Sequence, residues 1–324
     1  PVGALKSIRR EAFEKLKILV IESFLRTAEP LRSADSSQKT EAVGDRIAKR
    51  KGKTIFYVAT CEQLDAVAEE VSPSEAELWL DLCEEDLTEQ LKKYCETEKK
   101  GYQCYLVLPH IFRKKDALRY EKELDLKNTR VIINSFDELG FVMSHCETSD
   151  FKLSGQVYVM NKRSEKVLER LCRNDTDIMF TASLELNENE LKKLDISGLI
   201  FPVYGRIPLM YTAQCLRDNY LSCLKTGKGK NTDIAIRDQK NACFPVRTAC
   251  STCLNIIYNS KIYSLLTYNE SGNYCFSDLN AGAHLISFTF ESPEETKEVI
   301  RAFRETKELN GKDYTRGTFY RLVE

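Results

Sequence analysis

The sequence predicts an α/β protein, built as a (β/α)8 domain that resembles a TIM barrel. Two observations lead to this prediction. Short apolar runs alternate with amphipathic helical patterns, which is typical of a parallel sheet with helical crossovers. Eight such strand-and-helix units can be placed along the chain, and eight units are the number that closes a barrel. An open, doubly wound parallel sheet is the alternative that the same pattern allows.

The first seven strand-and-helix units are predicted within residues 53–210. The strands are expected at Thr54–Val58, Glu77–Leu82, Cys104–Leu108, Arg130–Ile133, Gln156–Met160, Ile178–Thr181 and Leu199–Tyr204. The helices between them are expected at Glu62–Glu70, Glu85–Glu98, Asp137–Ser144, Ser164–Cys172 and Glu188–Leu194. The change of apolar spacing from strand-like to helical separates each pair.

The eighth predicted strand comes late in the sequence. Leu285–Phe290 is apolar, and Glu294–Lys307 follows Pro293 as a helix, since proline is favoured in the first turn. Residues 285–324 therefore hold the last strand, its helix and a C-terminal tail. Residues 211–284 form a cysteine-rich insertion between strands seven and eight, and we expect it at the barrel mouth because the loops after the strands form the functional face.

Residues 1–52 are predicted to precede the barrel as an entry helix and a linker. Apolar residues recur at helical spacing within residues 4–28, whereas residues 29–52 lack periodicity. No apolar run of about 18 residues occurs and the first residues are charged, so we expect no membrane span, no signal peptide and a cytoplasmic location. Because the chain begins at Pro1, we expect it to be a portion of a longer protein.

The composition is that of a folded globular chain. Its 324 residues are 42% hydrophobic and 30% charged, with a net charge of −1, which argues against a globally basic nucleic-acid binder. Basic residues are concentrated within residues 46–53 and 225–247. Each run is compatible with a local phosphate-binding surface or with an ordinary solvated loop.

Five of the twelve cysteines lie between residues 215 and 253. Clustered cysteines in a chain without a secretion signal indicate metal binding before disulfides. Cys215, Cys223, Cys250 and Cys253 are the predicted ligands, with Cys243 as the spare thiol. Thiolates are soft ligands, so we expect a 4Fe-4S cluster, with zinc as the alternative. Structural or redox-active cysteines are the third possibility that the spacing leaves open.

Polar residues follow most of the predicted strands, and in a barrel they would share one face. They are Thr60, His110, Asn134, Asn161, Glu185, Asn187, Tyr204, Arg206 and Glu291. Any one of them is compatible with an ordinary loop or helix cap. Glu185 and Arg206 are the catalytic candidates, because Glu185 interrupts an apolar stretch as a possible acid or base and Arg206 suits a carboxylate or phosphate. Sequence motifs for a protease nucleophile or zinc protease are absent.

Several segments resemble the collagenase-like peptidase family U-32, in particular its long-form members. Tyr204-Gly-Arg-Ile-Pro-Leu-Met210 is similar to that family's Tyr-Gly-Arg-x-Pro-Leu-Met segment, and Ser183-Leu-Glu-Leu-Asn187 to its Ser-Pro-Glu-Leu-Asn motif. A strand ending in Asn161, the Cys250-x-x-Cys253 pair and a closing Tyr314-Thr-Arg-Gly317 segment follow the family order. Four positions depart from the pattern, namely Leu184, Gln239, Thr318 and Leu322.

The resemblance implies the second half of a long-form protein, whose N-terminal barrel would be its partner. Family members are described as collagen-degrading peptidases or resemble oxygen-independent hydroxylases that use a four-iron cluster on RNA bases or a ubiquinone precursor. We expect an iron–sulfur-dependent hydroxylase of an RNA base. A peptidase acting on a peptide substrate, or a non-catalytic scaffold half, are the alternatives. The residues expected to bind substrate are Asn161, Asn187, Tyr204 and Asp238.

Overall fold

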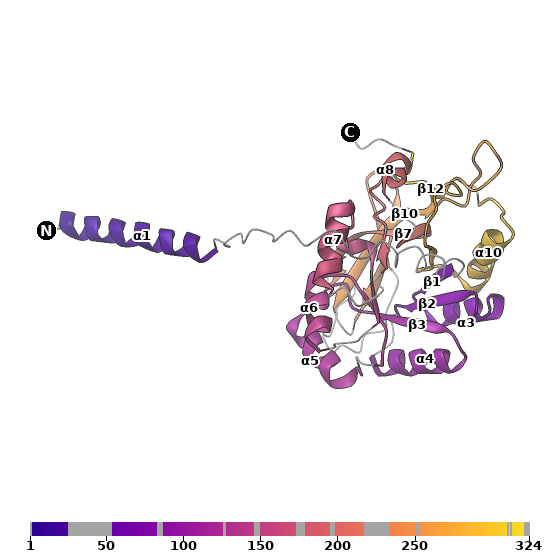
Figure 1. Cartoon of the computed structure of the whole chain (residues 1–324), viewed down its shortest axis with the longest axis horizontal. Coiled ribbons are helices and arrows are strands. Elements are labelled where there is room, and N and C mark those ends of the chain that lie inside the picture. Colours follow the sequence, from indigo (N-terminus) through magenta and orange to yellow (C-terminus); the bar gives the residue numbers. More distant parts are fainter. Residues whose placement is uncertain are drawn as a thin grey trace, which may run out of the picture. The chain divides into compact units, whose positions relative to one another are not determined.

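The computed structural model describes residues 2–24, 54–82, 87–125, 128–145, 150–172, 179–194, 198–216, 234–250, 253–309, 311 and 313–320. The chain divides into two compact units, Pro1–Asp45 and Arg46–Glu324. The described part of the first unit is helix α1 (Val2–Phe24), which confirms the predicted N-terminal helix (Figure 1). Its side chains over residues 6–20 are exposed.

The second unit is a closed barrel of eight parallel strands with helices between them (Figure 1). The strands are β1 (Thr54–Val58), β2 (Ala76–Leu80), β3 (Gln103–Val107), β4 (Val131–Ile133), β5 (Phe151–Leu153), β6 (Phe180–Thr181), β7 (Leu199–Thr212) and β11 (Ala283–Ser287). Each of the first seven pairs with the next, and β11 pairs with both β7 and β1. This closure confirms the predicted fold class and excludes the open sheet, in which β1 and β7 would have been edges.

Helices alternate with the barrel strands, and several of them begin at a polar side chain that caps the first turn. They are α3 (Cys61–Glu70), α4 (Leu87–Lys99), α5 (Lys114–Glu123), α6 (Phe136–His145), α7 (Lys162–Leu171), α8 (Glu188–Lys193) and α10 (Pro293–Arg304). Thr60, Asn161, Asn187 and Ser292 each accept a backbone N–H of the first turn and thereby satisfy donors that the helix leaves unpaired. Helix α5 was missed by the sequence analysis because it buries little besides Asp116 and Tyr120.

The fifth strand lies earlier than predicted. It is Phe151–Leu153 and pairs with β4, whereas Gly155–Val157, which overlaps the start of the predicted strand Gln156–Met160, forms a short 3₁₀ turn, η1. Lys152 interrupts the apolar run of this strand, which is why the pattern missed it. All three residues of β5 are nevertheless buried, because Lys152 finds a carboxylate partner inside the barrel.

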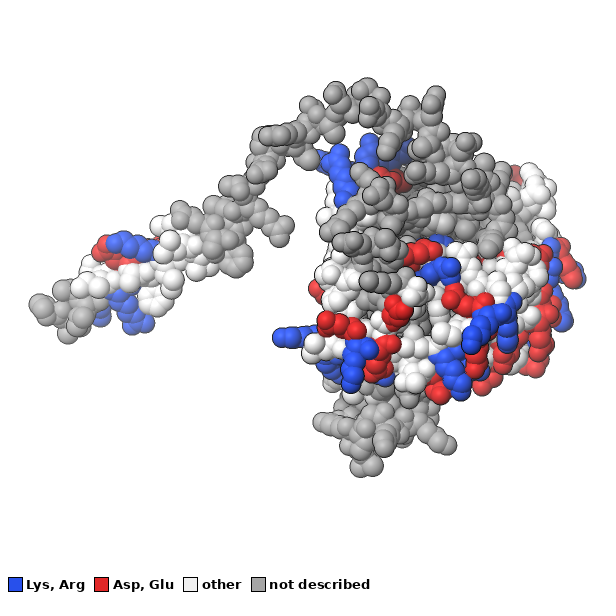
Figure 2. Space-filling view, turned by 60° about the horizontal axis from the view of Figure 1, so that its bottom comes forward, with Lys and Arg blue, Asp and Glu red and all other residues white. Residues whose placement is uncertain are grey.

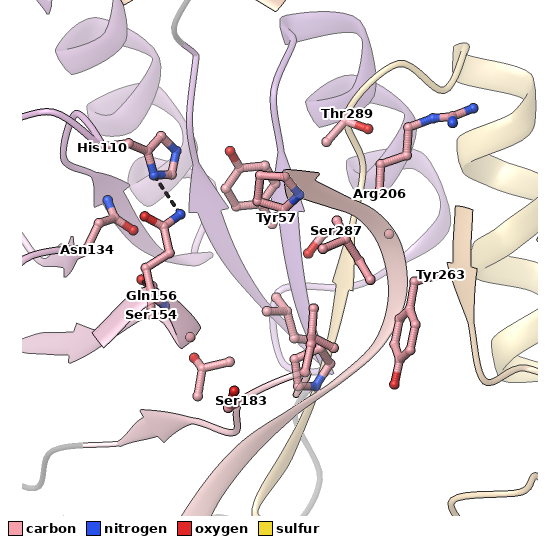
Figure 3. A pocket seen from close by; sticks show the side chains of 18 of the residues that line it. Tyr57, His110, Asn134, Ser154, Gln156, Ser183, Arg206, Tyr263, Ser287 and Thr289 are labelled. Atoms are coloured by element: carbon pink, nitrogen blue, oxygen red, sulfur yellow. Dashed lines mark hydrogen bonds between the residues drawn. The ribbon is translucent and has the colours of Figure 1, made fainter. Parts of the chain in front are cut away.

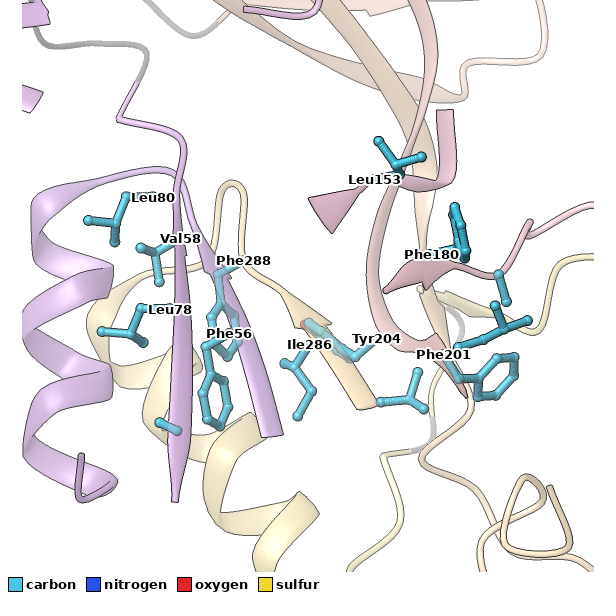
Figure 4. Close-up of a cluster of buried hydrophobic side chains, with 14 of the residues drawn as sticks. Phe56, Val58, Leu78, Leu80, Leu153, Phe180, Phe201, Tyr204, Ile286 and Phe288 are labelled. Carbon is cyan, nitrogen blue, oxygen red and sulfur yellow. The ribbon is translucent and has the colours of Figure 1, made fainter. Parts of the chain in front are cut away.

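The two faces of the barrel strands build two separate parts of the core. Outward-facing residues such as Phe56, Leu78 and Phe288 pack under the helices (Figure 4). Inward-facing residues fill the barrel interior; they are Ile55, Trp79, Tyr105, Val107, Ile132, Met179, Ile200 and Leu285. This alternation is the two-residue period of a strand that is buried on both faces.

The insertion between β7 and β11 extends the sheet as an antiparallel ribbon. Strand β10 (Leu254–Ser264) pairs with the second half of β7 and with β9 (Cys243–Ala249), and β9 pairs with β8 (Ile234–Arg237). We call the second half of β7 with β10, β9 and β8 the ribbon. The short strand β12 (Tyr314–Thr315) pairs with β10.

The outer surface carries charges of both signs. On the face seen in Figure 2, Lys and Arg side chains are interspersed with Asp and Glu. Ion pairs between α10 and the region of α3 join Lys297 to Glu69 and Arg301 to Glu70. This face has the mixed charge of an ordinary solvated surface. No helix among the described residues combines the length and apolar character needed to cross a membrane.

Candidate functional site

A cavity of about 430 Å³ opens at the carboxyl ends of the barrel strands (Figure 3). Its polar residues come from different strand ends, with Asn134 after β4, Ser154 after β5 and Ser287 at the end of β11. Its aromatic wall is formed by Tyr57, Trp79, Tyr158, Tyr204, Tyr211, Tyr258 and Tyr263. A concave, mostly apolar site with a few convergent polar groups is the usual form of a small-molecule or active site.

A histidine and a carboxylate meet at one side of this cavity. Asp81 follows β2 and His110 follows β3, and His110 Nε2 lies 3.4 Å from Asp81 Oδ2. The Tyr57 hydroxyl donates a hydrogen bond to the same carboxylate oxygen. The His110 and Asp81 side chains are only 8% and 10% exposed. The pair is therefore largely shielded from water while His110 itself lines the cavity.

Burial opposes charge on both members, but their attraction prevails. For His110, burial lowers the pKa, whereas the hydrogen bond to Asp81 and the attraction of its charge raise it, and the net pKa is raised. For Asp81, burial raises the pKa. The hydrogen bond and charge of His110, the hydrogen bond from Tyr57 and the charge of Arg247 lower it, and the net pKa is below its usual value. The imidazole can therefore hold a proton beyond the pH at which a free histidine loses it.

The second ring nitrogen of the histidine is also engaged. Gln156 Nε2 lies 2.9 Å from His110 Nδ1 (Figure 3) and donates a hydrogen bond to the Tyr211 hydroxyl. The rings of His110 and Tyr211 pack with their centroids 4.6 Å apart. We call the connected side chains of Tyr57, Asp81, His110, Gln156 and Tyr211 the mouth network. It links strand ends of the barrel to the ribbon, from which Tyr211 comes.

Two further buried charges lie close to the mouth network. Glu138 of α6 accepts hydrogen bonds from the Asn134 backbone N–H at 2.6 Å and from the Ser135 hydroxyl at 3.0 Å. Burial raises the pKa of Glu138 to about 7, although these hydrogen bonds and the charge of His110 act against the shift. Arg247 of β9 is 2% exposed and lies with its Cζ atom 4.9 Å from the centroid of the Phe290 ring.

Of the predicted site residues, Glu185, Tyr204 and Arg206 line the cavity. Glu185 is exposed in the turn after β6, where its backbone N–H donates to the Ser183 hydroxyl at 3.2 Å. Tyr204 is buried, and its hydroxyl donates to Glu291 Oε1 at 3.3 Å. Burial raises the pKa of Tyr204 far above its usual range, so this phenol stays protonated and serves as a hydrogen-bond donor.

Arg206 lies across the cavity from His110 (Figure 3). Its Nη1 donates to the carbonyl oxygens of Asn259 and Ser260 at 3.2 and 3.1 Å. Its buried Nε has no hydrogen-bond partner among the residues that the structure describes. The preceding Gly205 has φ +145°, and a Cβ there would lie 2.7 Å from Ser287 Cβ. Glycine is therefore required where β7 passes β11, directly before the arginine.

The other predicted substrate-binding residues do not line the cavity. Asn161 and Asn187 are the N-caps of α7 and α8, where their side chains accept backbone N–H groups of the first turn. Asp238 lies in the β8–β9 turn and accepts two backbone N–H groups at 2.8 Å. In each case the side chain satisfies local backbone donors.

The predicted metal ligands lie at one end of the ribbon, except that Cys223 is outside the described residues. Thr212 of β7 pairs with Asn255 of β10, and Asn255 Nδ2 donates to the carbonyl oxygen of Gln214 at 3.1 Å. Cys215 follows directly after this contact, and Cys253 precedes β10 in the β9–β10 turn. Strand pairing thus brings two segments that are distant in sequence to the same end of the ribbon.

The described cysteines do not by themselves form a metal site. Within the described ranges, no group of three or more Cys, His, Asp or Glu side chains is arranged to hold a metal ion. Cys243 begins β9 and Cys250 follows its end, so at about 3.3 Å per residue they lie roughly 20 Å apart along the strand. The spare thiol therefore belongs to the opposite end of the ribbon.

Four of the five members of the mouth network were not predicted from the sequence as site residues. Tyr57, Asp81 and Gln156 lay inside predicted strands, and Tyr211 was assigned to the insertion. A signal for Asp81 was present, because Glu77, Trp79 and Asp81 recur at every second position and so face the barrel interior together. A carboxylate at such a position needs a partner on another strand.

The fold and cavity define the class of the protein, a (β/α)8 barrel with an aromatic cavity and a buried histidine–aspartate pair at its mouth. No protein-family model matches the chain, and a search of curated proteins found no match either. Membership of the U-32 family therefore remains a prediction from the motifs.

Proposed function

We propose that the chain is an enzyme whose reaction takes place in the mouth cavity, with His110 and Asp81 as its proton-transfer pair. The observation that carries this proposal is the buried pairing of an imidazole and a carboxylate at the wall of an aromatic cavity. Catalytic groups of (β/α)8 enzymes lie at this end of the barrel. The raised pKa of His110 and the lowered pKa of Asp81 suit an acid–base pair.

The activity that we propose is an iron–sulfur-dependent, oxygen-independent hydroxylation of an RNA base, as the U-32 resemblance implies. A hydroxylated anionic co-substrate would supply the oxygen atom and be reduced in turn, so that the C–H of the base and the C–OH of the co-substrate exchange to give C–OH on the base and C–H on the co-substrate. Aromatic walls suit a planar ring, since exposed bases are commonly recognised by stacking. Arg206 lines the cavity, and its guanidinium is the candidate partner for an anionic group of the substrate or of a co-substrate. Glu185, exposed at the rim, is the candidate for contacts with the entering substrate.

Cys215, Cys223, Cys250 and Cys253 would hold the 4Fe-4S cluster, which would supply redox chemistry when bound. The described thiols suit this role, because Cys253 is exposed and adopts φ 53°, a conformation in which glycine or asparagine is favoured. Neither backbone preference nor burial explains a cysteine there, whereas a ligand role does. Zinc is the alternative metal for the same donors.

The contacts of His110 favour this activity over the peptidase alternative. A serine or cysteine peptidase needs one imidazole nitrogen on its nucleophile and the other on an orienting group. In this protein, Asp81 faces Nε2 and Gln156 faces Nδ1, and no serine, threonine or cysteine among the described residues is hydrogen-bonded to the imidazole. For His110 to exchange a proton with substrate, Gln156 would have to release Nδ1. The scaffold alternative gives no reason for a buried titratable pair at the cavity wall.

The proposal can be tested with the full chain purified without oxygen. We expect iron and sulfide in the protein and an added oxygen atom in the target RNA, measured by mass spectrometry. Cys253→Ser should lose iron, whereas His110→Gln should keep iron and lose activity. His145→Gln, which changes the histidine at the end of α6, is the matched control and should retain both. A colourless protein with one bound zinc, or full activity of the His110 variant, would contradict the proposal.

A further inference from the structure

Tyr158 adopts a backbone conformation that its residue type does not favour. It follows the 3₁₀ turn η1 with φ 55° and ψ 64°, and its backbone N–H donates to the Gly155 carbonyl at 3.3 Å. This left-handed conformation at the end of a helical turn is usually taken by glycine or asparagine. A bulky aromatic residue there is an outlier that calls for a reason other than local structure.

Core packing does not supply that reason. The Tyr158 side chain is 55% exposed, whereas Val157 and Val159 on either side are 7% and 2% exposed. The left-handed conformation of Tyr158 allows the valines on both sides to be buried, while the Tyr158 side chain stays outside the core. Yet Tyr158 lines the mouth cavity. Its position is therefore at the rim, with one part of the side chain towards the site and another towards water.

Tyr158 also lies close to the end of the mouth network. Its phenol is among the groups that raise the pKa of Tyr211, after burial and the phenol of Tyr258 and the carboxylate of Asp81. Gln156, two residues earlier, makes the hydrogen bond that joins Tyr211 to His110. One short turn thus delivers both a network member and an exposed aromatic ring to the same cavity.

We propose that Tyr158 is the platform on which the planar ring of the substrate stacks as it enters the cavity, and so determines the specificity for such rings. That the ring is an unpaired RNA base rests on the proposed function. An aromatic side chain that is half-exposed beside an aromatic cavity offers one open face to a base, and base–aromatic stacking tolerates different bases because each has a π face.

A left-handed conformation alone does not mark a functional residue. Thr306 has φ 53° and follows the end of α10, where its carbonyl oxygen accepts a hydrogen bond from the Tyr268 hydroxyl. It does not line the cavity. Tyr158 differs from it because the unfavourable backbone coincides with an exposed ring at the mouth. Thr306 is therefore a matched control for the backbone effect.

The test measures ring binding and stability together in the full chain. The probe is a short single-stranded RNA that contains the fluorescent base 2-aminopurine, whose emission changes on stacking. Tyr158→Phe should bind it as the unsubstituted chain does. Tyr158→Asn should bind about 5- to 100-fold more weakly, which corresponds to the stacking contribution of one base, and its Tm should rise by about 2–4 °C because asparagine relieves the backbone.

Thr306→Asn should raise the Tm without changing the affinity for the RNA. Unchanged binding by Tyr158→Asn, or no binding of the probe by the unsubstituted chain, would overturn the inference. Iron content and oxygen addition are measured separately. Binding that depends on Tyr158 without oxygen addition would remove the hydroxylase proposal and support this one, whereas oxygen addition that is unaffected by Tyr158→Asn would do the reverse.

Discussion

Strand β2 and the residue that follows it place two buried carboxylates, Glu77 and Asp81, on the inward side of the barrel, and their surroundings differ. Glu77 pairs with Lys152 of β5, whose Nζ lies 2.6 and 2.5 Å from the two carboxylate oxygens, and also accepts a hydrogen bond from Trp79 Nε1 at 2.8 Å. Asp81 pairs with His110 over 3.4 Å. We call these the inner pair and the mouth pair. Trp79 lies between the two carboxylates in sequence and also lines the cavity.

The difference shows how one strand can serve both stability and chemistry. The contact between Lys152 and Glu77 is short, direct and buried inside the barrel. Histidine titrates near neutrality, and the looser contact at the cavity wall permits its charge to change. The inner pair therefore ties β2 to β5 inside the barrel, whereas only the mouth pair is suited to proton transfer.

Removing the lysine of the inner pair should have the largest effect. Lys152→Met leaves Glu77 buried without its cation, and we expect a loss of about 3–5 kcal/mol in the free energy of unfolding. Urea denaturation monitored by the fluorescence of Trp79, the single tryptophan, would measure it. The double variant Glu77→Gln with Lys152→Met should recover much of the loss, because no unpaired charge remains.

Lys192→Met provides the surface comparison. Lys192 pairs with Glu188 on α8, with side-chain exposures of 46% and 24%, and its removal should change the free energy of unfolding far less than Lys152→Met does, because solvent screens an exposed pair. If Lys152→Met cost no more than Lys192→Met, the inner pair would not be a structural tie.

At the mouth pair, Asp81→Asn should cost about 2–3 kcal/mol, since it removes a charged hydrogen-bond partner of His110. With the carboxylate gone, burial becomes the dominant influence and lowers the pKa of His110. NMR titration can follow this shift, because the chain has only three histidines. The unsubstituted chain should show His110 titrating above its usual value, and the variant below it.

The same substitution should change how stability depends on pH. Because the folded-state pKa of His110 is raised, its contribution is fully present below the unfolded value of about 6.5 and is lost as pH rises through the folded value. Asp81 has a lowered pKa, so its contribution is present above about 4 and is lost as pH falls through the folded value. In Asp81→Asn the dependence that comes from Asp81 should disappear. The dependence that comes from His110 should change sign, because a folded-state pKa below the unfolded value makes stability rise with pH. An unchanged pH profile would mean that the two groups are not coupled.

The sequence predicted the barrel well because strand and helix periodicities are local properties. The error at β5 arose where local reasoning fails, since Lys152 looks incompatible with a buried strand until Glu77, far away in sequence, neutralises it. Closure itself depends on β11 meeting β1, and the count of eight units was the only local sign of it.

The candidate site was predicted less completely, because contacts between residues that are distant in sequence leave no local pattern. Glu185, Tyr204 and Arg206 were found because polar residues at strand ends stand out locally. Asn161 and Asp238 look similar in sequence, but their side chains satisfy nearby backbone donors. His110 was found in the same way, but its partners Tyr57, Gln156 and Tyr211 acquire their roles from contacts between separate segments of the chain.

A third buried carboxylate, Glu138, differs from those of the inner pair and the mouth pair, because its contacts are hydrogen bonds from the Asn134 backbone and the Ser135 hydroxyl. Its pKa is raised to about 7, so the folded state holds the proton more tightly than the unfolded chain and stability falls as pH rises from about 4.5 to 7. Glu138→Gln imitates the protonated form. We expect the gain in free energy of unfolding over the unsubstituted chain to be about 2–3 kcal/mol larger at pH 8 than at pH 5, since one pKa unit corresponds to about 1.4 kcal/mol. Urea denaturation at the two pH values measures it. A constant difference at both pH values would contradict a neutral carboxyl in the folded protein.

The smallest effect should come from the end of the mouth network in the ribbon. Tyr211→Phe removes the hydroxyl that accepts a hydrogen bond from Gln156 but keeps the ring that packs on His110, so we expect a loss of only about 0.5–1.5 kcal/mol. The effect of Tyr211→Phe on His110 is more informative than its effect on the free energy of unfolding. Gln156 would lose one of its two partners and hold the imidazole less firmly, and the NMR signals of His110 should broaden or shift. If they match those of the unsubstituted chain, the ribbon does not influence the mouth pair through Tyr211.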